Sequence, residues 1–467
     1  MRLASAPSGD FDALAISAGT ATRATSGGLD AGWRYSHTAT FSVAFAVYML
    51  FFAGHYVTGD AAQRIAWAKA LLNGSNDISD YFPGLHFTKY GIGGSLIHIP
   101  FLWTARAITR LTGIHCEGPV NMLLYEINGA LGVTIIYSIL TERCDLPRRD
   151  AFVRSLVIGF SSVWFTYTKV EYAESLAAVA LLSTLRFADS RPITAGLLGG
   201  FAIALRPDCI LWFIPTTIFG TSSRASRIRV FLAAVPWLAL VLWSNYARTG
   251  AIWNSGYEID FSTPLLVGLY GLVFSAGKSA LIFSPLLILY FSAVKRLWHD
   301  PKVKWLLNWS IVLIAGQLCF YGKWWDWSGD DSWGPRLIIF GSLAALLAIG
   351  VSDLPRTRWF RVLAGIGLVL QLPPLLIGPH TVILIDHQRP TAQSSDWTQA
   401  RGPLTLDDVR FNPAYSQVTN TADLLLLKML PGTGLVRRTR WMAREFPSGR
   451  ANVPIDVLWL RLVKATD

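Results

Sequence analysis

Apolar stretches of about 20 residues recur along this chain, and that length carries an α-helix across the hydrocarbon core of a bilayer. They occupy residues 37–55, 91–108, 119–140, 151–168, 175–188, 229–246, 279–294, 305–321, 336–352 and 361–385, with a broken pair at 193–205 and 209–220. Backbone polar groups inside lipid must be satisfied within the spanning segment. The stretches therefore predict an all-α polytopic membrane protein with about 10–12 transmembrane helices.

The composition agrees with this prediction. Hydrophobic residues make up 52% of the chain and charged residues 15%, whereas a soluble domain carries about 25% charged residues. Much of the positive charge behind the net +11 sits in short loops between the apolar stretches. Such loops orient a protein across a membrane, so no nucleic-acid partner is expected. The four cysteines are far apart and lack metal-ligand spacing, which argues against a disulfide framework or a zinc site.

The basic loops also predict which segments share a side of the membrane. Linkers 143–150, 222–229, 295–304 and 356–361 should face the cytoplasm, and residues 1–33, rich in Ala, Ser, Thr and Gly, are expected to form a disordered cytoplasmic tail. The opposite face then receives residues 56–90, 169–174, 247–278, 322–335 and a tail from about 386. This topology requires an odd number of crossings between 91 and 140, so either 91–108 or 119–140 should not span.

A carboxylate opens the loop that follows the first apolar stretch. Residues 60–73 read DAAQRIAWAKALLN and are followed by Gly74, a pattern that predicts a helix lying along the membrane surface. Asp60 stands at the start of this helix, where a carboxylate can accept the unpaired backbone N–H groups. Helix capping and catalysis are the two interpretations of Asp60 that the local sequence leaves open.

Other charged residues fall on the same predicted face as Asp60. The acids are Glu171, Glu174, Asp326, Asp330 and Asp331, and the cations are Lys89, Lys278 and Arg336. A non-catalytic scaffold does not require such clustering. Lys278 could contact a phosphate or extend its ammonium to the interface. Within the broken pair, Arg206 and Asp208 are expected to pair with each other, because charges at membrane depth are costly alone.

The order of these features resembles the GT-C superfamily of membrane glycosyltransferases over residues 37–385. The shared features are an acid after the first transmembrane helix, a surface helix, a lysine about 30 positions on and an acid that opens a later helix. The resemblance is strongest to the protein O-mannosyltransferase and aminoarabinose transferase branch. Two sequence segments, GLYGLVFSAGKSALIFSPLLIL (268–289) and WWDWSGDDSWGPRL (324–337), are similar to segments of bacterial members of this branch that use a phospholipid-linked sugar.

The resemblance implies an inverting glycosyltransferase of the bacterial inner (cytoplasmic) membrane. It would move a sugar from a polyprenyl-phosphate donor to a glycan, lipid or protein acceptor on the extracytoplasmic face, in contact with membrane lipids. Residues 34–385 would form the catalytic module, and residues 386–467 an extracytoplasmic or membrane-surface tail. A lipid-linked glycan flippase or other multi-pass transporter is the alternative. A transporter should show interrupted helices in corresponding halves, and the sequence shows one interruption, at 204–210.

The resemblance also implies residue roles. Asp60 corresponds to the catalytic base and Glu174, in preference to Glu171, to the later acid; Lys89 corresponds to the contact with the lipid phosphate. The full set of expected substrate-binding residues is Lys89, Glu171, Lys278, Asp326, Asp330, Asp331, Arg336 and His86. Ala61 stands where the family often has a second acid, so a divalent metal is a possibility that the motif does not itself imply.

Overall fold

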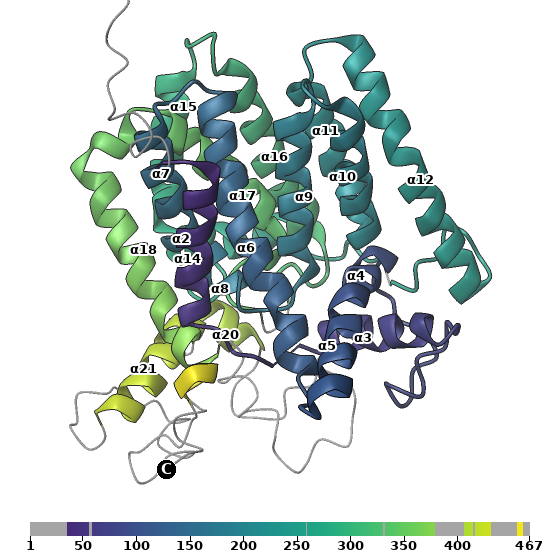
Figure 1. Cartoon of the computed structure of the whole chain (residues 1–467). Helices are drawn as coiled ribbons and strands as arrows, with labels where there is room; N and C mark the ends of the chain where they lie inside the picture. Colours follow the sequence, from purple (N-terminus) through teal and green to yellow (C-terminus); the bar gives the residue numbers. More distant parts are fainter. Residues whose placement is uncertain are drawn as a thin grey trace, which may run out of the picture.

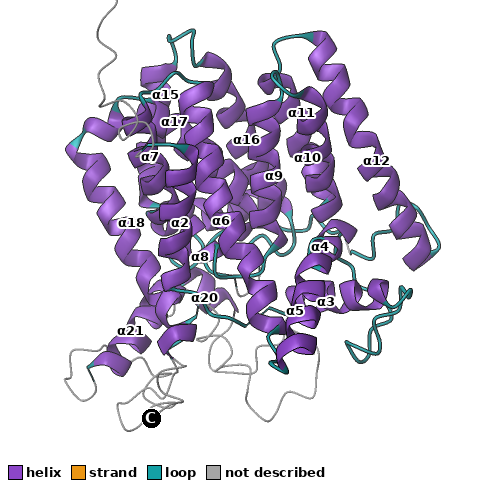
Figure 2. Ribbon diagram, viewed as in Figure 1, coloured by secondary structure: helices purple, strands orange, loops and turns teal. Residues whose placement is uncertain are grey.

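The computed structural model describes residues 35–55, 58–257, 259–329, 332–378, 406–413, 416–430 and 455–460. Within these ranges the regular elements are helices and no strand is present (Figure 2). The predicted all-α class is therefore confirmed. The predicted tail at 1–33 and much of the segment 386–467 lie outside the described residues.

Upright helices pack side by side in one bundle (Figure 1). They are α2 (His37–Leu50), α6 (Glu117–Glu142), α7 (Arg148–Phe160), α9 (Ala173–Phe187), α10 (Pro192–Leu205), α11 (Ile210–Gly220), α12 (Arg224–Thr249), α16 (Lys304–Lys323), α17 (Ile339–Val351) and α18 (Arg358–Ile377). Shorter pieces complete the bundle: α8 (Trp164–Tyr167), α13 (Leu265–Phe274), α14 (Ala280–Phe283) and α15 (Tyr290–Leu297). Helices α9 and α17 are buried along almost their whole length and form the centre of the core.

The outer helices have the character of membrane spans. Four described helices, α6, α12, α16 and α18, are long and apolar enough to cross a bilayer, and shorter apolar helices such as α2 and α10 stand beside them. Helix α12 exposes large apolar side chains, among them Leu232 (64%) and Trp243 (55%). Lipid can cover such a surface, because hydrocarbon solvates it better than water does. The chain is therefore an integral membrane protein.

Short helices close one end of the bundle. Helices α3 (Gly59–Leu72), α4 (Ile92–Leu96) and α5 (Ile99–Thr112) lie at the lower end in Figure 1, as do α20 (Leu406–Phe411) and α21 (Gln417–Met429). The basic linkers leading into α12 and α16 lie at the upper end. Segment 119–140 falls within α6, which is long and apolar enough to span, whereas 91–108 is divided between α4 and α5 at the lower end. This difference favours 91–108 as the segment that does not span.

The interruption predicted at 204–210 is present and turns the chain. Helix α10 ends at Leu205, the 3₁₀ turn η1 covers Pro207–Cys209, and α11 begins at Ile210. Arg206 is extended (φ −145°, ψ 112°), which is the conformation favoured for a residue before proline. The turn leaves Arg206 and Asp208 at the end of two packed helices, beside the first turn of α9.

Candidate active site

Helix α3 presents Asp60 in its first turn. The helix begins at Gly59 and its N-cap is Thr58, whose side-chain Oγ1 accepts a hydrogen bond from the Ala61 N–H at 3.1 Å. The capping interpretation of Asp60 is therefore wrong, because a hydroxyl two residues earlier already fills that role. The Asp60 carboxylate still gains from the partial positive charge of the helix N-terminus, and it is left to make other contacts.

Two donors from distant parts of the chain hold the Asp60 carboxylate. Arg336 Nη1 lies 3.2 Å from Oδ2, and the Tyr90 hydroxyl donates to Oδ1. Burial, reinforced by the Asp60 charge, raises the pKa of Tyr90 above its ordinary value, so this hydroxyl remains a donor at neutral pH. About 23% of the Asp60 side chain stays exposed. The carboxylate is thus oriented on both oxygens while part of it remains accessible.

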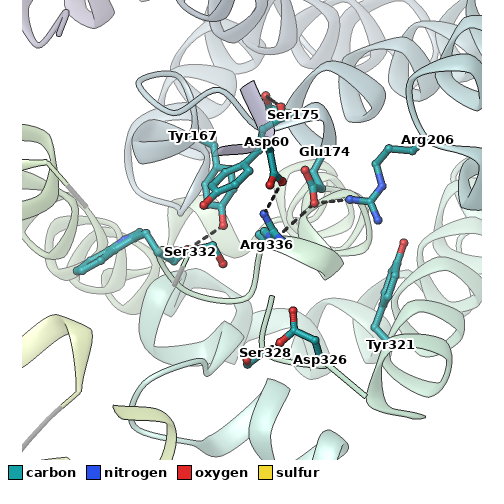
Figure 3. A network of polar contacts seen from close by, with 12 residues as sticks. Asp60, Tyr167, Glu174, Ser175, Arg206, Tyr321, Asp326, Ser328, Ser332 and Arg336 are labelled. Atoms are coloured by element: carbon teal, nitrogen blue, oxygen red, sulfur yellow. Dashed lines mark hydrogen bonds and ion pairs between the residues drawn. The ribbon is translucent and has the colours of Figure 1, made fainter. Parts of the chain in front are cut away.

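Arg336 joins Asp60 to Glu174 (Figure 3). It starts the 3₁₀ turn η3 (Arg336–Ile338) directly before α17, and only 8% of the residue is exposed. Its Nε lies 3.6 Å from Glu174 Oε1, and its guanidinium carbon lies 4.5 Å from the ring centroid of Tyr172. Aromatic stacking and two carboxylates therefore fix this cation in a largely dry position.

Glu174 is shared with a second arginine. It lies in the first turn of α9, and Arg206 Nη1 donates to its Oε1. Arg206 also binds Asp208 through two parallel contacts of 3.1 Å, from Nε and from Nη2. The Tyr321 hydroxyl donates to the same Asp208 carboxylate. The predicted Arg206–Asp208 pair is therefore confirmed, and the structure extends it into the site through Glu174.

Glu171 precedes Glu174 by three residues. The residue is fully buried, and its backbone carbonyl accepts a hydrogen bond from Arg64 Nη2. The Arg64 guanidinium carbon in turn lies 5.5 Å from the ring centroid of Tyr90. Between the two acids proposed for one role, Glu174 is the one that the structure places against Arg336.

Lys89 and His86 occupy the loop between α3 and α4 at different distances from the site. Lys89 is exposed, and its Nζ lies 4.8 Å from the ring centroid of Tyr257 and 5.8 Å from that of Tyr90, the tyrosine that contacts Asp60. The His86 side chain is 80% exposed, and its Nδ1 lies 3.0 Å from Asp77 Oδ2. Lys89 thus borders the Asp60 cluster, whereas His86 points to solvent.

Lys278 and Asp326 flank the loop that carries Arg336. Lys278 is 1% exposed, and its Nζ donates to the Ser332 carbonyl at 2.5 Å. Of the two alternatives for Lys278, extension to the interface is therefore wrong, and contact with a phosphate stays a prediction. Asp326 accepts from the Ser328 hydroxyl at 3.1 Å and lies 3.4 Å from Arg410 Nη2. Figure 3 shows Asp326 and Ser328 on the other side of Arg336 from Asp60. Asp330 and Asp331 lie outside the described residues.

The arrangement sets a carboxylate beside two guanidinium groups. Among the described residues, no group of three or more His, Cys, Asp or Glu side chains is placed to hold a metal ion. The Arg336 guanidinium fills the position between Asp60 and Glu174, where a cation would otherwise bridge the two carboxylates. A carboxylate that can take a proton thus stands beside guanidinium groups that can neutralise a phosphate.

The comparisons with known proteins give a distant likeness in fold. No family model matches this chain, and no curated protein matches its sequence. The solved structures that match are ArnT from Cupriavidus metallidurans bound to undecaprenyl phosphate (15% identity, TM-score 0.47) and the same protein in the apo state (14% identity, TM-score 0.48). Each match covers 90% of this chain and 74% of the other. Likeness at this level assigns neither an activity nor a substrate.

Proposed function

We propose that this membrane protein is an inverting glycosyltransferase that moves a sugar from a polyprenyl-phosphate carrier to an acceptor hydroxyl on the extracytoplasmic face. One observation carries the proposal: Asp60 is held between Arg336 and Tyr90 at the end of the bundle closed by α3–α5. The order of acids and lysine along the sequence, similar to that of GT-C enzymes, supports the same conclusion.

Asp60 is the proposed base. As the acceptor oxygen forms a bond to the anomeric carbon, its proton passes to the Asp60 carboxylate, and the bond from that carbon to the phosphate oxygen breaks. The electron pair leaves with the phosphate, which is a stable anion and requires no protonation. One displacement inverts the anomeric centre, so a β-linked donor gives an α-linked product.

Arg336 is the proposed link between donor binding and base activation. It contacts both Asp60 and Glu174, and a phosphate that enters the site would compete for its guanidinium. A bidentate phosphate contact is stronger than a single contact to a carboxylate, because both N–H groups of the fork are used. Asp60 would then lose part of its ion pair and accept a proton more readily. Arg206 continues to neutralise Glu174 throughout.

The setting at the membrane surface suits a lipid-linked donor. Aromatic side chains are exposed at this end of the bundle, including Trp103 (59%) on α5 and Trp253 (81%) after α12. Tryptophan favours the headgroup layer. A phosphate bound near Lys89 and Arg336 would lie at that level, with its polyprenyl chain in the bilayer. The proposal places this surface outside the cytoplasm, as the basic linkers at the other end predict.

The experiment that tests the proposal is a donor screen with the purified protein in nanodiscs. A panel of radiolabelled polyprenyl-phosphate sugars is supplied with a membrane extract as acceptor, and both label transfer and release of polyprenyl phosphate are followed. Consumption of one donor with release of the carrier supports the proposal. If proteoliposomes instead move an intact lipid-linked glycan between leaflets and consume no donor, the transporter alternative is correct.

A further inference from the structure

The loop that ends in Arg336 is fixed from two directions. On the side of the bundle, the Ser332 carbonyl accepts from Lys278 at 2.5 Å and the Trp333 carbonyl accepts from the Tyr167 hydroxyl at 2.9 Å. These contacts secure the loop as far as Trp333. Gly334 comes next, in a left-handed conformation with φ +63°, and Arg336 follows two residues later. What holds the peptide at Gly334 therefore controls where the guanidinium lies.

That hold comes from a C-terminal segment. The Gly334 N–H donates to Gln417 Oε1 at 3.1 Å, and Gln417 is 2% exposed. Gln417 is the first residue of α21, a helix that packs against α18. A hydrogen bond buried this deeply has no water to replace it, so its loss leaves the Gly334 N–H unsatisfied.

The same C-terminal segment also seats against the turn before Lys278. The Gly277 N–H donates to the Arg410 carbonyl at 2.9 Å, and a Cβ added at Gly277 would lie 2.0 Å from the Val409 carbonyl oxygen. Only glycine permits this approach of two backbones. The Arg410 side chain adds a contact to Asp326 at 3.4 Å and lies over the Trp327 ring, 5.6 Å from its centroid. The segment therefore contacts the loop before Arg336 at Asp326 and Trp327 as well as at Gly334.

We propose that residues 406–413 and 416–430 form a C-terminal strap that positions the Arg336 loop, and that Gln417 is its positioning residue. Gln417 holds the Gly334 peptide so that the Arg336 guanidinium stays between Asp60 and Glu174. The catalytic consequence of this contact rests on the proposed function, whereas the fixing of the loop does not. The strap thus makes a segment remote in sequence part of the active-site framework.

The test compares two substitutions at Gln417 in the full-length protein. Gln417→Leu keeps the size and removes the acceptor, whereas Gln417→Glu keeps an acceptor oxygen. Met429→Leu, at a 63% exposed position at the far end of α21, is the matched control. Amide hydrogen exchange is measured on the peptide that contains residues 332–338, and kcat and KM for the donor are measured in parallel. Gly277→Ala perturbs the second contact independently.

We expect Gln417→Leu to accelerate exchange of this peptide and to lower kcat/KM, each about five- to tenfold, the effect of one buried hydrogen bond. Met429→Leu should stay near wild type, and Gly277→Ala should act as Gln417→Leu does. Gln417→Glu keeps the acceptor for Gly334 but places a charge at a buried position, so both of its values should fall between those of wild type and Gln417→Leu. Faster exchange with unchanged kcat/KM would overturn the positioning role, and unchanged exchange would overturn the strap itself. If the wild type transfers no sugar, the proposed function fails, while the exchange comparison still decides whether the strap fixes the loop.

Discussion

Replacement of Arg336 by glutamine probes the centre of the proposed mechanism. The three carboxylates of Asp60, Glu174 and Asp208 and the two guanidiniums of Arg206 and Arg336 sum to a charge of −1. Arg336→Gln makes this sum −2 at the place where we propose that the donor phosphate binds. Because Arg336 is only 8% exposed, water screens little of the added repulsion.

The magnitude follows from the role of a preorganised donor. Removal of one group that stabilises developing charge typically costs about 10²–10³-fold in rate, or roughly 3–4 kcal/mol of transition-state stabilisation. We expect kcat/KM for the donor to fall by this factor, with KM raised and kcat lowered, because in the proposed mechanism Arg336 contacts both the phosphate and the base. Arg336→Lys keeps the charge and loses the planar fork, so its loss should be about tenfold.

The assay is steady-state transfer from a purified polyprenyl-phosphate sugar in nanodiscs, with product and carrier separated by chromatography. Arg361→Gln is the matched control, since Arg361 is exposed in the first turn of α18 at the other end of the bundle. Thermal unfolding of each variant separates lost activity from lost folding. A kcat/KM for Arg336→Gln within threefold of wild type, with the fold intact, would refute the reasoning.

Three further predictions concern the surroundings of the site. Lys89→Ala should weaken donor binding about fivefold, since an exposed charge contributes about 1 kcal/mol, and equal Kd values would remove its phosphate contact. Tyr90→Phe should lower kcat about tenfold by releasing one oxygen of Asp60; an unchanged kcat would show that this hydrogen bond does not orient the base. Asp456→Asn should lower stability by about 3 kcal/mol at pH 7, because Asp456 Oδ2 lies 3.1 Å from the buried Lys169 ammonium. Burial raises the pKa of Asp456, but His55 and Lys169 outweigh this effect and hold that pKa below its ordinary value. The stability that Asp456 contributes is therefore complete above about pH 4 and declines as the pH falls below it. Equal thermal unfolding midpoints for wild type and Asp456→Asn at pH 7 would contradict this prediction.

Local patterns predicted the helical framework well. The periodicity of residues 60–73 predicts a helix that begins near Asp60, and α3 spans Gly59–Leu72. The charged Arg-Pro-Asp sequence predicts the break between α10 and α11, because proline and charge both act on the nearest turn. The one error of detail at Asp60 has a local cause: Thr58 lies two residues earlier and caps the helix in its place.

Partners from distant segments could not be predicted in the same way. The sequence predicts the pair between Arg206 and its neighbour Asp208, but it does not predict the contact of Arg206 with Glu174, 32 residues away. Arg336 meets Asp60 across 276 residues. Such contacts depend on how α9, α10 and α17 pack, and no spacing in the sequence encodes that packing. Tyr90 was missed for a similar reason, since an aromatic residue at a membrane surface needs no function.

The most direct test of Asp60 as the base separates donor binding from turnover. Asp60→Asn keeps the size of the side chain and removes its capacity to take a proton, and Asp77→Asn, an exposed acid of the same loop, is the control. Donor Kd and the single-turnover transfer rate are measured for both. The account predicts that Asp60→Asn binds the donor within about threefold of wild type and transfers at least about 10²-fold more slowly, whereas Asp77→Asn is unchanged in both. Equal transfer rates for Asp60→Asn and wild type would contradict it.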